Sequence, residues 1–286
     1  MNQNHHQPSQ SDRRARNAQM AQETINLLPG LLSTIPNSSQ DGFLYPSQQQ
    51  PTLNMKYCPG LPRTPIKVYD CDSFDSAIKL AQRPPPTGTR DTKPVLVQNL
   101  ASHKRPGGGW LGGSSAQEES LCYRSSLSLT LKKRFYPISE DSAVYSPQVV
   151  IMRTGQRDGY KLMDLTQPQA LPVVSVVSNA ALRHPQLNAS GNYRFPSDRV
   201  AMKVKMRSIL RIAAWKQHRR LVLGAFGCGA FANPNKEVAA MWAEVFAEPE
   251  FSGGWWESVI FAVMKDGRGA NGNFEVFKSR LEGMMV

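Results

Sequence analysis

The sequence predicts an α/β fold: a three-layer α/β/α sandwich around a mainly parallel or mixed central sheet, with a helical extension at the N-terminus. From about residue 55 onward, segments with the pattern of strands alternate with segments that have the period of helices. Two strand segments, 147–153 and 172–180, are apolar runs rich in β-branched residues, which is typical of strands covered on both faces. Hydrophobic residues make up 40% of the 286 residues, enough for one large domain of this kind.

Residues 1–54 are expected to form the N-terminal extension. A helix is predicted over 12–32, capped by Ser11 and broken at Pro29-Gly30, because apolar residues recur there at steps of three and four. Residues 33–54 are rich in Ser, Pro and Gln and predict a flexible linker. We expect the helix to pack on the main domain, residues 55–286.

The main domain contains the alternating elements in order. Strands are predicted at 66–70, 94–100, 147–153, 172–180, 220–226 and 256–264, and helices at 73–81, 115–133, 198–218, 235–247 and 273–283. In sheets of this kind, ligands bind beyond the carboxyl ends of the strands. The segments that follow each strand are therefore where a functional site is expected.

The chain carries a formal net charge of +12, and all of this excess lies in the main domain. Residues 1–54 contribute nothing net, because three arginines balance Asp12, Glu23 and Asp41. A basic field of this size favours polyanionic partners such as nucleic acid or phosphate-rich ligands. The segment 199–220 holds eight of the basic residues and is either a solvated face or a surface that attracts a polyanion.

The four cysteines, Cys58, Cys71, Cys122 and Cys228, show neither CxxC pairing nor metal-ligand spacing. We therefore expect no metal, and a reducing intracellular compartment that is either nuclear or cytoplasmic. The sequence also lacks an apolar run as long as a membrane span and a signal-like N-terminus, so we expect a soluble protein with no membrane partner.

Two glycine-rich segments follow predicted strands. Gly107–Gly109 come after the strand at 94–100, and Gly227–Ala230 come after the strand at 220–226. Each leads into a helix, whose first backbone amides form an anion site. The second segment fits G-x-G-x-x-A, but the residues that follow it are helical in pattern, so the dinucleotide fingerprint fails; no GK[ST] follows either segment. Together, the two segments predict a site that holds a bridged phosphate from two sides.

Gln117, Glu118 and Glu119 stand at the start of a predicted helix. Their simplest interpretation is a capping box with Ser114 and Ser115, since acids in a first turn suit the helix dipole. The functional alternative is a catalytic carboxylate. Adjacent helical residues do not face each other, so one acid would reach the reacting centre, first as acid and then as base, while the other braces the site.

The segment KRPGGGWLGGSSAQEESLCYRSSL (104–127) resembles the GGG-x(7)-QEE signature of the microbial-type poly(ADP-ribose) glycohydrolases, and similarity to this family extends over about 15–280. The resemblance implies a macrodomain-like fold and hydrolysis of the ribose–ribose O-glycosidic bonds of poly(ADP-ribose), releasing ADP-ribose without a metal or organic cofactor. It also implies removal of single ADP-ribose groups. ADP-ribose, its polymer and ADP-ribosylated proteins are the expected partners, with nucleic acid as a further one through the basic surface.

The resemblance also assigns roles to individual residues. Glu119 would be the catalytic glutamate, Glu118 would hold ribose hydroxyls, and Gln117 closes the motif. The remaining substrate-binding residues that it implies are Asn99 for the ribose, Gly107, Gly108 and Gly109 for the ribose and diphosphate, Gly227, Cys228, Gly229 and Ala230 for the diphosphate, Phe231 for the terminal ribose, and Asn233 as a brace.

Some alternatives stay open. A macrodomain that binds ADP-ribose without turnover would keep the glycine segments but leave the glutamates unexplained. Trp110 either covers the ligand or packs in the core, and Cys228 is more simply a small residue in a tight loop than an activated thiolate. His103 has no evident acidic partner for a nucleophilic triad, and the segment 178–185 matches the family loosely, which leaves the adenine pocket undefined.

Overall fold

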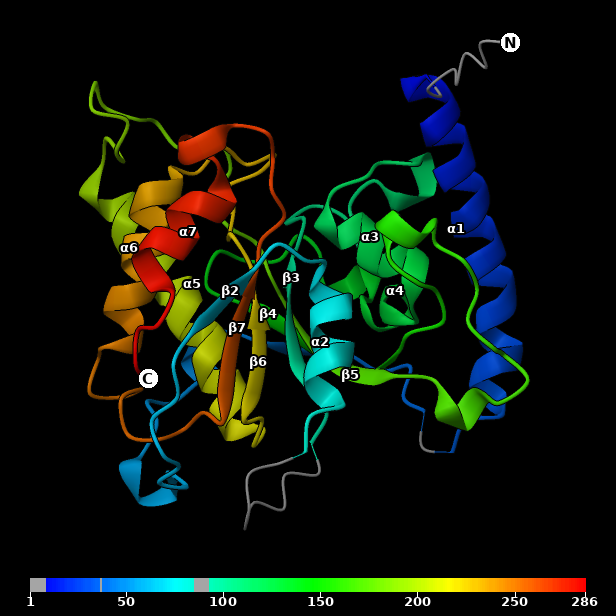
Figure 1. Cartoon of the computed structure of the whole chain (residues 1–286), viewed down its shortest axis with the longest axis horizontal. Coiled ribbons are helices and arrows are strands. Elements are labelled where there is room, and N and C mark those ends of the chain that lie inside the picture. Colours follow the sequence, from blue (N-terminus) through cyan, green and yellow to red (C-terminus); the bar gives the residue numbers. More distant parts are fainter. Residues whose placement is uncertain (1–8, 37, 85–92) are drawn as a thin grey trace, which may run out of the picture.

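A mixed β-sheet forms the middle layer of the computed structural model, which describes residues 9–36, 38–84 and 93–286 (Figure 1). Within these residues, seven strands pair in the order β1-β4-β5-β3-β6-β7-β2. Their bounds are β1 (Phe43–Tyr45), β2 (Lys67–Tyr69), β3 (Leu96–Leu100), β4 (Ala143–Val150), β5 (Val173–Asn179), β6 (Arg220–Leu223) and β7 (Ser258–Ala262). The strands from β5 to β2 are parallel, β4 pairs antiparallel with β5, and β1 pairs antiparallel with β4. The predicted α/β fold with a mixed sheet is confirmed.

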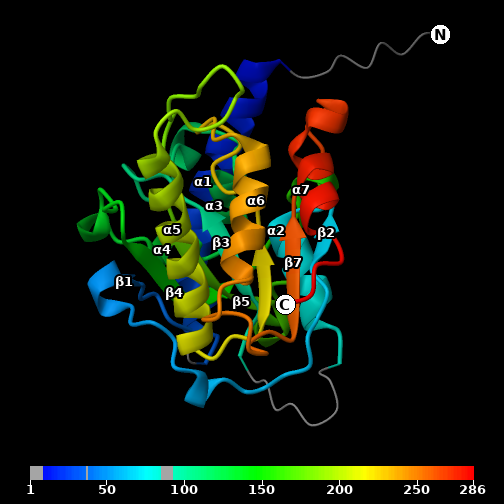
Figure 2. The same ribbon diagram turned by 90° about the vertical axis from the view of Figure 1, so that its left-hand side faces the viewer.

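Helices cover both faces of this sheet. The helices α5 (Pro196–Trp215), α6 (Asn235–Phe246) and α7 (Asn273–Leu281) lie on one face, and α2 (Ser73–Ala81), α3 (Gln117–Arg124) and α4 (Leu127–Thr130) lie on the other (Figures 1 and 2). Side chains alternate between the two layers: Leu221 and Leu223 pack with α5 to α7, whereas Val222 packs on the opposite side. Two covered faces explain why the central strands are apolar at every position.

The helix α1 (Gln10–Ser33) differs from its prediction at both ends. Ser9, not Ser11, is its cap: the Asp12 amide donates to Ser9 Oγ at 3.1 Å, and the Asp12 carboxylate accepts from the Ser9 backbone. The helix also continues through Pro29 instead of breaking there. Its last turns are buried in a separate cluster with Val150, Met152 and Leu171, and this burial offsets the backbone hydrogen bond that proline removes.

The expected packing of α1 on the main domain is confirmed. Thr24 Oγ1 donates to the Tyr123 carbonyl at 2.8 Å, and Asn17 Nδ2 donates to the Gly113 carbonyl at 3.2 Å. The segment expected to be a linker is partly ordered: residues 43–45 pair with β4 as β1, so they belong to the sheet.

The helix predicted over 115–133 is interrupted. After α3, Ser125 is extended and forms an isolated bridge with Ile151 next to β4, so α3 ends at Arg124 and the short α4 begins separately. The side chain of Ser125 supplies a hydrogen-bond donor to a backbone carbonyl in the last turn of α3: its hydroxyl donates to the Leu121 carbonyl at 2.7 Å.

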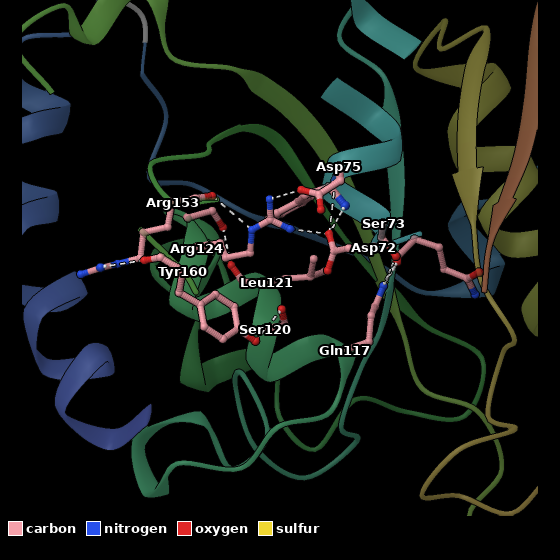
Figure 3. Close-up of polar contacts among 12 residues, drawn as sticks. Asp72, Ser73, Asp75, Gln117, Ser120, Leu121, Arg124, Arg153 and Tyr160 are labelled. Atoms are coloured by element: carbon pink, nitrogen blue, oxygen red, sulfur yellow. Dashed lines mark hydrogen bonds and ion pairs between the residues drawn. The ribbon is translucent and has the colours of Figure 1, made fainter. Parts of the chain in front are cut away.

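A buried arginine ties α3 to the start of α2 (Figure 3). The Arg124 guanidinium is fully buried and pairs with the carboxylates of Asp72 and Asp75, while its Nε donates to the Arg153 carbonyl at 3.2 Å. Asp72 also caps α2 by accepting from the Phe74 amide at 2.7 Å. A buried charge is tolerated only when it is paired, so this network fixes α3 relative to α2.

The basic residues of α5 are largely paired with acids of α6 and the turn after it. The ion pairs are Arg199 with Glu237 and Glu244, Lys203 with Glu244 and Glu248, Arg207 with Glu248, and Arg211 with Glu250. Four of the eight basic residues of 199–220 are therefore neutralised locally. No helix of the described residues is both long and apolar enough to cross a membrane.

Candidate active site

A cavity of about 360 Å³ opens at the carboxyl ends of β3, β6 and β7. It brings together two parts of the chain that are about a hundred residues apart. Its walls include Gln117, Glu118 and Glu119 from the start of α3, and Gly227, Gly229, Ala230 and Phe231 from the segment after β6. The strand-end position is where open α/β sheets bind ligands.

Gln117 fastens the first turn of α3 to β3. Its Oε1 accepts from the Leu100 amide at 2.8 Å, and its Nε2 donates to the Gln98 carbonyl at 2.8 Å. The same Nε2 donates to Ser73 Oγ of α2 at 3.1 Å (Figure 3). Because the side-chain amide is held at both its oxygen and its nitrogen, Gln117 fixes where the next two residues point.

Glu118 is buried and held by neutral donors. The Ser102 amide donates to Glu118 Oε2 at 2.7 Å, and Asn99 Nδ2 donates to Glu118 Oε1 at 3.3 Å. Burial raises the pKa of Glu118 to about 8, although these hydrogen bonds favour the charged form and the neighbouring Glu119 adds to the increase. Glu118 therefore carries its proton at neutral pH.

Glu119 is held on one oxygen only. The Gly109 amide donates to Glu119 Oε1 at 2.8 Å, while Oε2 is buried and has no hydrogen-bond partner among the described residues. At position 108, φ is +59° and an added Cβ would lie 2.5 Å from Glu119 Oε1. The backbone of Gly108 can approach the carboxylate this closely only because it has no side chain.

The triple glycine lies behind the acids. Gly107 to Gly109 are not among the residues that line the cavity, and an added Cβ on Gly107 would lie 2.7 Å from the Trp110 ring. Trp110 is buried, and its ring centre lies 6.1 Å from that of Tyr123. Of the two alternatives for this residue, the structure therefore supports packing in the core. The predicted contact of these glycines with ribose and diphosphate stays a prediction.

Asn99 likewise lies behind Glu118 and is fully buried. Its amide nitrogen donates to Ser178 Oγ at 3.0 Å as well as to Glu118. It is not among the cavity-lining residues, so the structure places it as a support for Glu118. Its predicted contact with the ribose stays a prediction.

The second glycine segment is braced by Asn233. Asn233 Nδ2 donates to the carbonyls of Leu182 at 2.7 Å and Gly227 at 3.1 Å, and its Oδ1 accepts from the Tyr193 hydroxyl at 2.8 Å. Gly227 has a φ of +76°, and a Cβ there would lie 2.5 Å from Asn233 Nδ2. Gly229 differs, since a Cβ there would meet nothing within 4 Å although the residue lines the cavity.

Cys228 and Phe231 point in different directions. The Cys228 thiol is buried against the Phe226 carbonyl, outside the cavity, and burial raises its pKa. This thiol is therefore not an activated thiolate. Phe231 lines the cavity, and the His103 ring packs on it edge to face at 6.5 Å.

Several lining residues were not predicted. Asn273, at the start of α7, lines the cavity and donates to the Cys228 carbonyl at 3.3 Å. The side of the cavity next to α2 is formed by Cys71, Asp72, Ser73 and Gln156. The sequence gives no indication that these residues line a site, because the pattern around them is that of ordinary helix caps. Among the described residues, no group of three or more His, Cys, Asp or Glu is placed to hold a metal ion.

Comparison with known proteins identifies the family. Residues 9–154 match the model for the microbial-type PARG catalytic domain. The structure resembles poly(ADP-ribose) glycohydrolase from Thermomonospora curvata, with 27% identity and a TM-score of 0.72, covering 93% of this chain and 100% of that one. The same enzyme bound to the inhibitor ADP-HPD gives 26% identity and a TM-score of 0.73 at the same coverage.

Poly(ADP-ribose) glycohydrolase from Deinococcus radiodurans in complex with ADP-ribose is 29% identical, with a TM-score of 0.69 over 90% of this chain and 98% of that one. No curated protein matches the sequence. The family model spans about half of the chain and includes both acids and the triple glycine. This chain belongs to the microbial-type poly(ADP-ribose) glycohydrolase family.

Proposed function

We propose that this chain hydrolyses the ribose–ribose O-glycosidic bonds of poly(ADP-ribose), releasing ADP-ribose, with Glu119 as the catalytic residue. Family membership supports the reaction. The observation that carries the assignment of Glu119 is the carboxylate itself: it lines the same cavity as the second glycine segment, and one of its oxygens has no partner among the described residues.

The bound terminal unit would place its diphosphate at the backbone amides of residues 227–230 and its terminal ribose against Phe231. Protonated Glu119 then donates its proton to the leaving 2′-oxygen while the bond from that oxygen to the anomeric carbon breaks. The bonding electrons pass to the oxygen, and the sugar becomes an oxocarbenium ion. Water adds to the anomeric carbon and gives a proton to the Glu119 carboxylate, which restores the acid.

Glu118 would serve as a neutral partner in this reaction. With its pKa raised to about 8, it carries a proton and can donate a hydrogen bond to a ribose oxygen while Ser102 and Asn99 hold it in place. Because the two acids are adjacent on a helix, they do not face each other across the bond. One acid therefore performs both proton transfers, and the other positions the sugar.

The proposed substrates also include ADP-ribosylated proteins and single ADP-ribose groups, since the cavity of about 360 Å³ is within the size range of sites for small molecules. ADP-ribose and the inhibitor ADP-HPD are bound by the related enzymes from D. radiodurans and T. curvata, which supports the same ligand class here. The four free cysteines fit an intracellular location.

The direct test is Glu119→Gln on labelled polymer. Glutamine keeps the oxygen that accepts from Gly109 but removes the proton donor, so we expect kcat to fall by about 100-fold or more while polymer binding is retained. Released ADP-ribose and polymer affinity are measured in parallel. Tight binding by the wild-type protein without release would identify a reader of ADP-ribose instead, and equal release by both proteins would remove Glu119 from the mechanism.

The raised pKa of Glu118 predicts a pH-dependent stability. The folded state holds this proton more tightly than the unfolded state, whose carboxyl titrates near 4.5, so stability falls as the pH rises from 4.5 to about 8. Glu118→Gln removes this titration. We expect its melting temperature, relative to wild type, to increase between about pH 5 and about pH 8. The control is Glu275→Gln, a half-buried surface carboxyl that pairs with Lys265. Parallel curves for Glu118→Gln and wild type would contradict the buried, protonated state.

Alanine substitutions at the two glycines of the second segment should have different effects on stability and on ADP-ribose binding. Gly227→Ala should lower the free energy of unfolding by roughly 1–3 kcal/mol, because the position has positive φ and no room for a Cβ. Gly229→Ala should leave stability unchanged but weaken ADP-ribose binding by about tenfold or more, because its methyl group enters the ligand space. Calorimetric melting and titration with ADP-ribose measure both. Unchanged affinity in Gly229→Ala would mean that the diphosphate binds elsewhere.

A further inference from the structure

The segments that follow β3 and β5 carry three cations near the residues that contact Phe231. Lys104, Arg105 and Arg183 are all exposed, and we call them the cationic rim. Because β3 and β5 are parallel neighbours, the segments after them leave the sheet at the same end. Ser102 and Ala181, two residues before Lys104 and Arg183, both line the cavity.

Hydrogen bonds fix these segments against the site. The Gly108 amide donates to the Arg105 carbonyl at 3.0 Å, so Arg105 begins the turn that carries the triple glycine. The His184 amide donates to the Phe231 carbonyl at 2.8 Å, which ties the residue after Arg183 to the second glycine segment. Phe231 is therefore in contact with residues next to Lys104 and next to Arg183, namely His103 and His184.

The charge of the cationic rim is not neutralised by neighbouring acids. Among the described residues, no ion pair involves Lys104, Arg105 or Arg183, whereas the basic residues of α5 are paired in series. Burial lowers the pKa of the His103 imidazole, and every charged group that adds to this shift is a cation: Lys104, Arg183 and Lys205. The carboxylates of Glu140 and Asp141 act on Lys205, which is buried behind this surface.

The chemistry of the polymer supplies an anion at this position. The leaving group in the proposed reaction is the 2′-oxygen of an adenosine ribose, whose 5′-carbon carries the pyrophosphate of the next unit. That pyrophosphate is one furanose ring away from the bond that breaks at Glu119. In the proposed mechanism the terminal ribose lies against Phe231, and the ring that packs on Phe231 belongs to His103, the residue before Lys104. The leaving chain would therefore start close to the cationic rim.

We propose that the cationic rim binds the pyrophosphate of the ADP-ribose unit on the leaving side of the bond, and so favours polymer over a single ADP-ribose group. This inference rests on the proposed glycohydrolase function. Exposed ion pairs are individually weak, but three cations around one doubly charged group act together. The cationic rim would act on substrate choice and leave the bond-breaking step unchanged.

The test compares two substrates with the same terminal unit. One is poly(ADP-ribose), and the other is ADP-ribose with a nitrophenyl group at the anomeric carbon, which has no leaving-side pyrophosphate. The variant Lys104→Ala, Arg105→Ala, Arg183→Ala removes the cationic rim. Its matched control, Lys56→Ala, Arg63→Ala, Arg280→Ala, removes the same charge from exposed positions outside the segments that line the cavity.

We expect the rim variant to lose about tenfold in kcat/KM on polymer at low salt and to stay within about twofold of wild type on the nitrophenyl substrate. Its polymer activity should also depend less on salt than that of wild type or control. Equal losses on both substrates, no loss on either, or the same loss in the control would overturn the proposal. Affinity for single-stranded DNA is measured for the same variants. If the rim variant loses this affinity but cleaves polymer normally, the cationic rim binds nucleic acid and the proposal is overturned. A wild-type protein inactive on both substrates would instead refute the proposed function.

Discussion

Among the described residues, the hydrogen bonds to the acids of the site come from backbone amides and a neutral side chain, not from a cation, and the rest of the site depends on this. Ser102 and Gly109 supply the amides, and Asn99 supplies the side chain. A carboxylate next to a buried arginine would be kept ionised, whereas burial among neutral donors raises the pKa of Glu118 to about 8. A protonated Glu118 can donate a hydrogen bond, which is the role proposed for it. Glycine is needed at position 108, because a Cβ there would lie 2.5 Å from Glu119 Oε1.

Placing two acids side by side in a buried turn is costly, and the surrounding structure offsets that cost. Arg124, the last residue of α3, carries the charge that fixes this helix, and it does so through Asp72 and Asp75 rather than through the acids of the motif. Gln117 fixes the other end of α3 on β3. In the proposed mechanism, positioning and chemistry are therefore carried by different residues of one short helix.

Much of the fold and the centre of the site follow from local patterns. Strand and helix periodicity predicts the layers, and the resemblance of residues 104–127 to the GGG-x(7)-QEE signature implies which acids to expect in the site. The errors lie where distant segments decide the outcome. The break at Ser125 depends on a bridge to Ile151, the continuation of α1 through Pro29 depends on burial against β4 and Leu171, and Asn273 enters the site only because α7 begins there. The pairing of α5 with α6 could not be foreseen for the same reason: its acids come from another element.

The most direct measurement is a crystal structure of this protein with ADP-ribose bound. The account predicts the pyrophosphate on the backbone amides of residues 227–230, the terminal ribose against Phe231, and Glu119 Oε2 within hydrogen-bond distance, about 2.6–3.2 Å, of the anomeric oxygen. A ligand whose terminal ribose lies away from Glu119, or whose pyrophosphate contacts neither glycine segment, would contradict it.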